Sequence, residues 1–65
     1  MMQSIRMKDL TPGNIFTYEM ILHDRKAYIV DGVDTDRVHI TNRDDYFDSE
    51  WVSISNVHVY LLGNY

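Results

Sequence analysis

Apolar and polar residues alternate along much of the chain, and the alternation is clearest over residues 51–65. Every second residue is apolar in two short runs, 52–54 and 57–61, and the two runs are out of step at Ser55-Asn56. Alternation of this kind is typical of strands with one buried face, because successive side chains point to opposite sides. The break predicts a tight corner between two strands, a feature of small closed barrels.

Three earlier strands are predicted from the same alternation and from the residues that separate them. Pro12-Gly13 marks a turn before the first strand, residues 23–26 form a polar hairpin connection, and residues 34–36 form a short turn. Gly32 lies near the end of a strand, a position typical of a bulge or sharp bend. Residues 42–49 are predicted to form a polar loop. The five predicted strands cover residues 15–22, 27–33, 37–41, 50–54 and 57–62.

Five short strands joined by hairpins and one corner predict an all-β domain that is too small for a sandwich. Closing the sheet into a barrel removes the free edges that would otherwise invite aggregation. We therefore predict a single domain, 1–65, in which residues 10–62 form a small five-stranded barrel. Residues 1–9 form an irregular or helical N-terminal segment, and residues 63–65 form a tail that frays. The predicted core is Leu10, Phe16, Tyr18, Tyr28, Val30, Val33, Val38, Ile40, Val52, Ile54, Val57, Val59 and Leu61.

The order of the turn and core residues resembles that of a known class of small barrels. The elements of this order are Leu10-x-Pro12-Gly13-Asn14-x-Phe16, Tyr28-x-Val30-x-x-Val33, Val38-x-Ile40, Trp51 and Val57-x-Val59. Over residues 8–62 the chain resembles the small SH3-like barrel proteins of bacteria and their bacteriophages. The resemblance implies an SH3-like barrel fold and the binding of other macromolecules, and it brings no catalytic residue with it.

Composition limits the classes of protein to which the chain can belong. It has 65 residues and no cysteine, so burial alone must stabilise it, without a disulfide or a Cys/His zinc site. The absence of cysteine fits a reducing cytoplasm, which is the location we expect. No segment has the pattern of a signal peptide or the ~20 apolar residues that span a bilayer. We therefore expect a soluble, complete small gene product that has no membrane partner.

The net charge of −4 is concentrated in the middle of the chain. Residues 31–50 carry seven acids and two arginines, whereas residues 51–65 contain no Asp, Glu, Lys or Arg. Because Lys and Arg must neutralise phosphates, this distribution disfavours nucleic acid as a partner. Two interpretations of the acids are open. They cap turns and keep the protein soluble, or they form a negative patch that meets a basic partner or imitates DNA phosphates.

The sequence shows no pattern of catalytic or metal-binding residues. His23, His39 and His58 lie in a hairpin and on two different strands, without the spacing of a ligand pair, so we interpret them as exposed polar residues. Acid pairs such as Asp44-Asp45 lie in predicted turns, where nothing apolar is expected to raise their pKa values. We therefore predict that the protein is not an enzyme and uses no metal or cofactor.

Surface aromatic residues are the strongest indication of function. Trp and Tyr supply a large contact area at low entropic cost, so they dominate the energetics of many interfaces. Two interpretations are open here as well: these rings cover an open end of the barrel, or they form an interface with a partner. The predicted partner-binding residues are Trp51, Tyr46, Phe47, His58 and Tyr60, with Asp44, Asp45 and Asp48 as a charged rim.

The leading hypothesis is a non-enzymatic protein-binding module, such as a small phage or bacterial regulator that docks on a larger host protein. Self-association through Tyr60, Leu62 and the methionine-rich N-terminus belongs to the same hypothesis. One alternative is an acidic DNA mimic, in which the acids of residues 34–50 occupy the nucleic-acid site of an enzyme. The other is a single-stranded nucleic-acid-binding barrel whose aromatic residues stack on bases.

Overall fold

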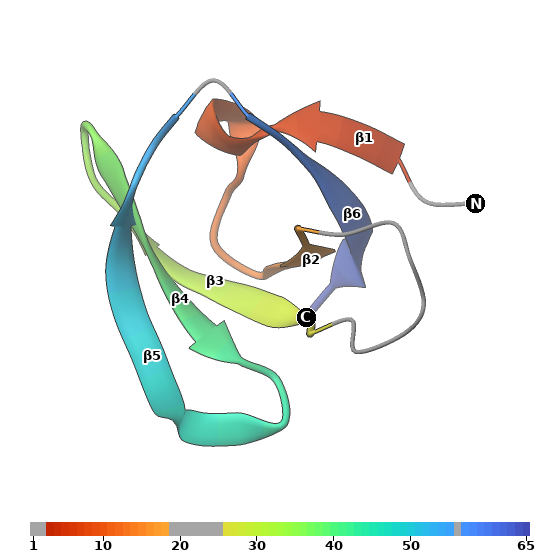
Figure 1. Ribbon diagram of the computed structural model, residues 1–65, viewed down its shortest axis with the longest axis vertical. Coiled ribbons are helices and arrows are strands. Elements are labelled where there is room, and N and C mark those ends of the chain that lie inside the picture. The colour runs from red at the N-terminus through yellow and green to blue at the C-terminus, as the bar shows by residue number, and fades with distance from the viewer. Residues whose placement is uncertain (1–2, 19–25, 56) are drawn as a thin grey trace.

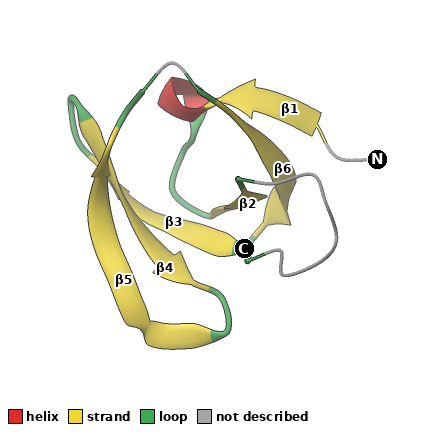
Figure 2. Cartoon of the chain, in the orientation of Figure 1, coloured by secondary structure: helices red, strands yellow, loops and turns green. Residues whose placement is uncertain are grey.

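The computed structural model describes residues 3–18, 26–55 and 57–65 and shows an all-β protein built on one antiparallel sheet (Figures 1 and 2). The six strands follow the order β1-β6-β2-β3-β4-β5 across the sheet. Within the described ranges, no helix is long and apolar enough to cross a membrane. The elements are β1 (Gln3–Arg6), the 3-10 helix η1 (Met7–Asp9), β2 (Asn14–Thr17), β3 (Tyr28–Val33), β4 (Arg37–Asn42), β5 (Asp45–Ser53) and β6 (His58–Asn64).

The all-β class is confirmed, but the predicted five-stranded SH3-like barrel is wrong in strand number and in closure. The sheet is open, and β1 and β5 are its two edge strands. Figure 1 shows a strongly curled sheet, with β5 on the left and β1 and β6 at the upper right. The β2–β6, β3–β4 and β4–β5 ladders each contain a shift of register. Such irregularities bend and twist strands, so they curl the sheet without joining its edges.

The N-terminal segment contains a strand that the sequence did not predict. β1 pairs with β6, and Ile5 lies opposite Val59 in that ladder. Met7–Asp9 then forms a single 3-10 turn, so the prediction of an irregular or helical segment over residues 1–9 is wrong for Gln3–Arg6 and holds only for that turn. Gln3–Arg6 has a single apolar residue and shows no alternation, so pairing with β6 rather than local propensity makes it a strand.

The predicted turn before β2 is confirmed, and it fixes the C-terminal tail. Gly13 has a φ of 95°, a left-handed conformation that glycine adopts without steric cost, and the Asn14 N–H donates to Thr11 O at 3.1 Å. The Asn14 side-chain amide donates to Asn64 Oδ1 at 2.6 Å, and these two residues also pair in the β2–β6 ladder. The prediction that residues 63–65 fray is therefore wrong, since β6 continues to Asn64.

The predicted polar loop over residues 42–49 is also wrong, because β4 and β5 form one hairpin. Arg43-Asp44 makes a two-residue turn, and β5 runs over Asp45–Ser53 instead of beginning at Glu50. Acidic residues are depleted in strands, so the acids of this segment indicated a loop. Pairing with β4, which carries two core residues, overrides this local preference.

Part of the predicted pattern cannot be compared with the structure. β2 ends at Thr17, so the first predicted strand, 15–22, is confirmed only in its first part. Residues 19–25, which hold the rest of that strand and most of the predicted hairpin connection, lie outside the described residues. Asn56 at the predicted corner between two strands also lies outside them.

A single apolar cluster fills the interior of the curled sheet. Six of its seven buried residues belong to the predicted core, and Met7 is the exception. Tyr28, Val52 and Ile54, also predicted, are partly buried and pack against the cluster together with Ile5. The buried members are Met7, Leu10, Phe16, Val30, Val38, Ile40 and Val59.

Three predicted core residues instead lie at the surface: Tyr18 is 39% exposed, Val33 46% and Val57 48%. The Met7 N–H donates to Val57 O at 3.1 Å, so η1 lies directly against the chain at Val57. Met7 itself is only 2% exposed. The 3-10 helix thus supplies the interior side chain at this end of the sheet, and the Val57 side chain remains outside.

Met7 and Val57 provide a direct test of this arrangement. Met7→Ala is expected to lower the free energy of unfolding by about 2–5 kcal/mol, because it removes a buried side chain and leaves a cavity. Val57→Ala is the matched control and is expected to change that free energy by about 0.5 kcal/mol or less. Urea unfolding followed by circular dichroism measures both. Equal losses in the two variants would contradict the packing described above.

Candidate functional site

β3 contains a bulge with one extra residue, Asp31. The Asp31 carboxylate lies on the outer face of the sheet. We use this name for the face of β3–β5 that lies away from the apolar cluster. Val30 lies opposite Ile40 of β4, but the next paired residue of β3 is Gly32, which lies opposite His39. Asp31 therefore has no partner in the ladder, as the extra residue of a β-bulge does. The predicted bulge near Gly32 is confirmed.

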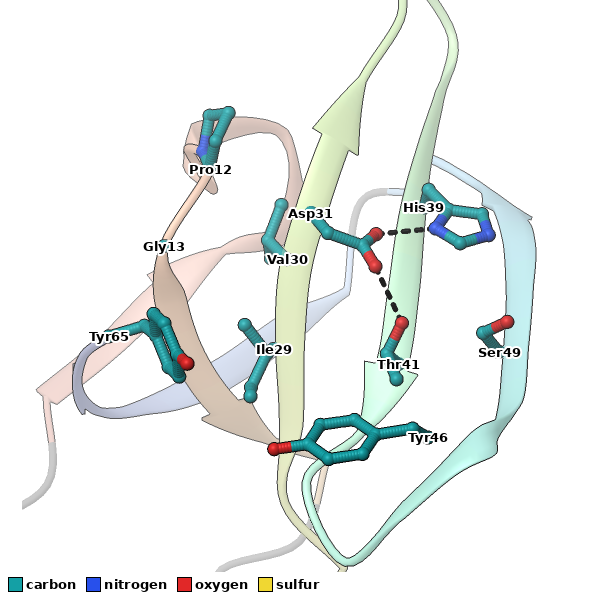
Figure 3. A pocket seen from close by; sticks show the side chains of 10 residues that line it. All are labelled: Pro12, Gly13, Ile29, Val30, Asp31, His39, Thr41, Tyr46, Ser49 and Tyr65. Carbon is teal, nitrogen blue, oxygen red and sulfur yellow. Dashed lines mark hydrogen bonds and ion pairs between the residues drawn. The ribbon is translucent and has the colours of Figure 1, made fainter.

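The Asp31 carboxylate joins β3 to two side chains of β4 (Figure 3). Thr41 Oγ1 donates a hydrogen bond to Oδ2 at 2.6 Å, and His39 Nδ1 is hydrogen-bonded to Oδ1. Desolvation alone would raise the pKa of Asp31. The hydrogen bonds from Thr41 and His39, with the electrostatic attraction of His39, outweigh it and hold that pKa below the ordinary 3.8. Asp31 is therefore a fixed negative charge on the outer face at neutral pH.

Trp51 of β5 lies on the same face, beside two side chains of β4. Its ring centroid is 5.1 Å from that of His39, and the Arg37 guanidinium carbon lies 4.5 Å from the indole centroid, a cation–π contact. Arg37 Nε is also 3.4 Å from Asp34 Oδ2, so the guanidinium is held from two sides. A Cβ atom at Gly32 would lie 3.5 Å from Trp51 Cη2, so a branched side chain at that position would meet the indole ring.

An open hollow of about 530 Å³ lies next to this cluster (Figure 3). The Asp31–His39–Thr41 hydrogen bonds line one side of it, and the rings of Tyr46 and Tyr65 border it. The remaining lining comes from the turn before β2, from β3 and from β5. A few polar groups that converge on an apolar concavity are the usual composition of a binding site.

A second bulge, in β5, carries two exposed aromatic residues, Tyr46 and Phe47. Thr41 pairs with Ser49 and Asn42 pairs with Asp45, so the residues between them on β5, 46–48, have no partner on β4. Asp45 Oδ1 accepts the Phe47 N–H at 3.0 Å, and Asp48 Oδ2 accepts the Asn42 side-chain amide at 3.2 Å. These bonds hold the backbone of the bulge in place, while the Phe47 side chain is 99% exposed.

The acids of the predicted rim have local contacts in the hairpin. Asp45 and Asp48 accept the hydrogen bonds of the bulge, and Asp44 Oδ1 lies 4.0 Å from Arg43 Nε. Such contacts are those expected of acids that cap turns, the first of the two interpretations that the sequence left open. All three residues are exposed, so their charges remain available at the surface.

The structure brings together part of the predicted partner-binding set. Tyr46, Phe47 and Trp51 lie on β5 together with the acidic rim. His58 and Tyr60 lie on β6, which β2, β3 and β4 separate from β5 in the sheet. The predicted residues are therefore divided between two strands, with one group along β5 and a separate pair on β6. Their role in partner binding stays a prediction.

The histidines occupy different environments. His58 is exposed on β6, as expected, whereas His39 is half-buried and bonded to Asp31, so its interpretation as an exposed polar residue is wrong. His23 lies outside the described residues. In the part of the chain that the structure describes, no group of three or more His, Asp or Glu side chains is placed to hold a metal ion.

Of the residues that line the hollow, only Tyr46 was predicted to bind a partner, and Asp31, Thr41 and Tyr65 are among those that sequence reasoning missed. Gly32 indicated a bulge, but the sequence did not indicate which residue the bulge would displace or toward which face. Thr41 lies on the outer face with His39, and the Asp31 carboxylate of the neighbouring strand accepts its hydrogen bond. Tyr65 belongs to the predicted tail, and only pairing of β6 with β2 brings it to the hollow.

Comparison with the models of known protein families, with curated proteins and with solved structures finds no match to this chain. Its class therefore rests on its own architecture. It is a small all-β protein with one six-stranded antiparallel sheet and an aromatic-bordered hollow on the outer face.

The hydrogen bond from Thr41 predicts the titration of Asp31. Thr41→Val removes the donor at nearly constant shape, so the pKa of Asp31 is expected to rise, whereas Thr41→Ser keeps the hydroxyl and is expected to leave it near the wild-type value. Because the folded pKa lies below the unfolded one, this carboxylate stabilises the fold above about pH 4, and the contribution is lost as pH falls through the folded pKa. Carbon-13 NMR of the carboxyl group measures the shift. Identical titration midpoints in wild type and Thr41→Val would disprove the bond.

Gly32 predicts the position of the indole ring. Gly32→Ala adds a Cβ at ordinary contact distance from Trp51 and is expected to be tolerated, whereas the branched side chain of Gly32→Val is expected to displace the ring from Arg37 and His39. The chain has one tryptophan, so quenching of its fluorescence by acrylamide reports this displacement directly. Quenching is expected to increase in Gly32→Val alone. An unchanged Trp51 environment in that variant would place the ring elsewhere.

Proposed function

We propose that this protein is a non-enzymatic protein-binding module whose contact surface is the β5 aromatic surface, consisting of Tyr46, Phe47 and Trp51, together with the hollow beside it. The observation that carries the proposal is the exposure of these rings: Phe47 is 99% exposed, Tyr46 72% and Trp51 46%. Large apolar rings that are exposed along one strand of a small protein favour an interaction site, because covering them with a partner is favourable.

The β5 aromatic surface is held in place before any partner binds. Asp45 and Asp48 fix the backbone of the bulge, and Arg37 and His39 contact the indole ring of Trp51. A contact group that is already ordered loses less conformational entropy on association, so more of its burial energy appears as affinity. Aromatic side chains gain most from this, since they offer a large area with few rotatable bonds.

The hollow adds polar groups that can orient a partner. Asp31 is ionised and its carboxylate borders the hollow, which Ser49 of β5 lines as well. Apolar area supplies most of the affinity in protein interfaces, whereas a few directed polar groups decide which partner fits. The combination on this face supports recognition of another protein rather than unspecific adhesion.

Phe47 gives the cleanest test, because its ring is almost fully exposed and its removal should leave the fold intact. A photo-crosslinking amino acid at position 47 is used to capture the partner from the native cell lysate, and the purified partner is then titrated by calorimetry. Phe47→Ala is expected to weaken binding by about 2 kcal/mol, which is roughly thirtyfold in Kd.

Lys8→Ala, at an exposed position on η1, is the matched control and is expected to keep wild-type affinity. If Phe47→Ala and Trp51→Ala, both shown to be folded, bind as tightly as wild type, the proposal is wrong. If the captured partner is a nucleic-acid enzyme that is released at high salt whatever residue stands at position 47, the acids rather than the aromatic rings make the interface.

A further inference from the structure

β5 is an edge strand, and its backbone offers a row of hydrogen-bonding groups on the side away from β4. The direction of these groups follows from one bond. The Ile54 N–H donates to Asp36 O at 2.9 Å, and this pair continues the register in which Val38 lies opposite Val52. In antiparallel sheets, hydrogen-bonded pairs alternate with pairs whose backbone groups point away from each other.

The alternation identifies the outward-facing residues of β5. Val52 and Glu50 belong to the hydrogen-bonded series, so their N–H and C=O groups point toward β4. The N–H and C=O groups of Ser49, Trp51 and Ser53 therefore point to the free edge. Among the described residues, no strand pairs with this side of β5.

We propose that the partner presents an extended, basic segment that pairs with this free edge of β5 and continues the sheet. The proposal rests on the protein-binding function above and names the chemistry of the partner. Main-chain hydrogen bonds give such strand addition its affinity, and the side chains that flank the edge give it specificity.

Charge complementarity selects a basic segment. Asp45, Asp48 and Glu50 are exposed acids of β5, and the strand has no Lys or Arg. In the pairing register Glu50 and Trp51 lie on opposite faces. A paired segment would therefore set an apolar side chain beside Trp51 and a Lys or Arg beside Glu50, in strict alternation.

The same charges disfavour a second copy of this chain as the occupant. Antiparallel self-pairing of β5 about Ser49 would place Asp48 opposite Glu50 twice, and like charges directly opposite each other are destabilising. The other edge strand, β1, has four residues, and its one cation, Arg6, already lies 3.9 Å from Asp9. The whole chain has a net charge of −4, which adds to the repulsion between copies.

The test uses a fluorescent peptide of about seven residues, a typical strand length, that alternates valine and lysine. Fluorescence anisotropy measures its binding to the full chain. A peptide that alternates valine and glutamate controls for charge, and a peptide of the same valine and lysine composition without alternation controls for spacing. The alternating basic peptide is expected to bind at least about tenfold more tightly than either control, with an affinity that falls as salt rises.

Ser53 allows the backbone contribution to be isolated. Ser53→Pro removes one outward N–H without touching the ladder to β4, and edge positions accept proline. Ser53→Ala is the matched control, because it changes the side chain but keeps that N–H. Binding is expected to weaken about tenfold in Ser53→Pro and to stay near wild type in Ser53→Ala.

Amide hydrogen exchange of the wild-type protein provides a test that needs no variant. On addition of the basic peptide, exchange is expected to slow at the amides of Ser49, Trp51 and Ser53 and to stay unchanged on β1. Equal binding of the acidic peptide, no binding at all, or protection on β1 instead would overturn the proposal.

Two further outcomes separate this proposal from the protein-binding function. If the captured partner loses affinity for Phe47→Ala but binds folded Ser53→Pro as well as wild type, the protein-binding function stands and strand addition fails. If the protein forms dimers or rings in solution with protected β5 amides and no peptide, the occupant is a second copy and the basic partner is wrong.

Discussion

The limited volume of the interior is the constraint on which the rest of this structure depends. A chain of 65 residues without cysteine must obtain its stability from one apolar cluster, and seven buried side chains already fill it. Met7, the first residue of η1, and Leu10, which directly follows η1, belong to that cluster. The aromatic residues of β5 lie outside this cluster, because Trp51 is on the outer face and residues 46–48 have no partner on β4. Exposure of these rings therefore follows from the face and the bulge of β5 on which they lie.

The outer face is held by polar contacts rather than by burial. One bulged residue, Asp31, accepts hydrogen bonds from Thr41 and His39, and His39 in turn contacts the indole of Trp51. A chain of directional contacts thus connects β3, β4 and β5 across a surface that lacks a core of its own. Such contacts are individually weak in water, but they fix orientations, and orientation is what a recognition surface requires. The Asp45 and Asp48 bonds do the same for the second bulge.

Alternation of apolar residues was sufficient to predict the all-β class and five of the seven buried side chains, and Leu10 was predicted from its place at the turn before the first strand. It could not predict β1, because Gln3–Arg6 becomes a strand only by pairing with β6 far along the chain. It also placed Val57 inside, since nothing local indicates that Met7 of the 3-10 helix lies next to it. For the candidate site, the exposed rings of β5 were readable from composition and spacing. The hollow was not, because its polar side arises from a register shift at Asp31 and one of its bordering rings, Tyr65, comes from the other end of the chain.

The acids of β5 bear on two properties of an exposed edge strand: its tendency to pair with copies of itself and its accessibility to another segment. A long edge with exposed aromatic rings would otherwise pair with copies of itself, and charged residues are the usual protection against this. In β5 the protective residues all have the same sign, so they repel another β5 strand while leaving the outward backbone groups accessible to a segment of opposite charge. In the proposed strand addition, uniform negative charge serves both to prevent self-pairing and to select the partner. A mixed set of charges would protect the edge equally well but would not discriminate in this way, which is why the sign pattern, more than the number of acids, carries functional information.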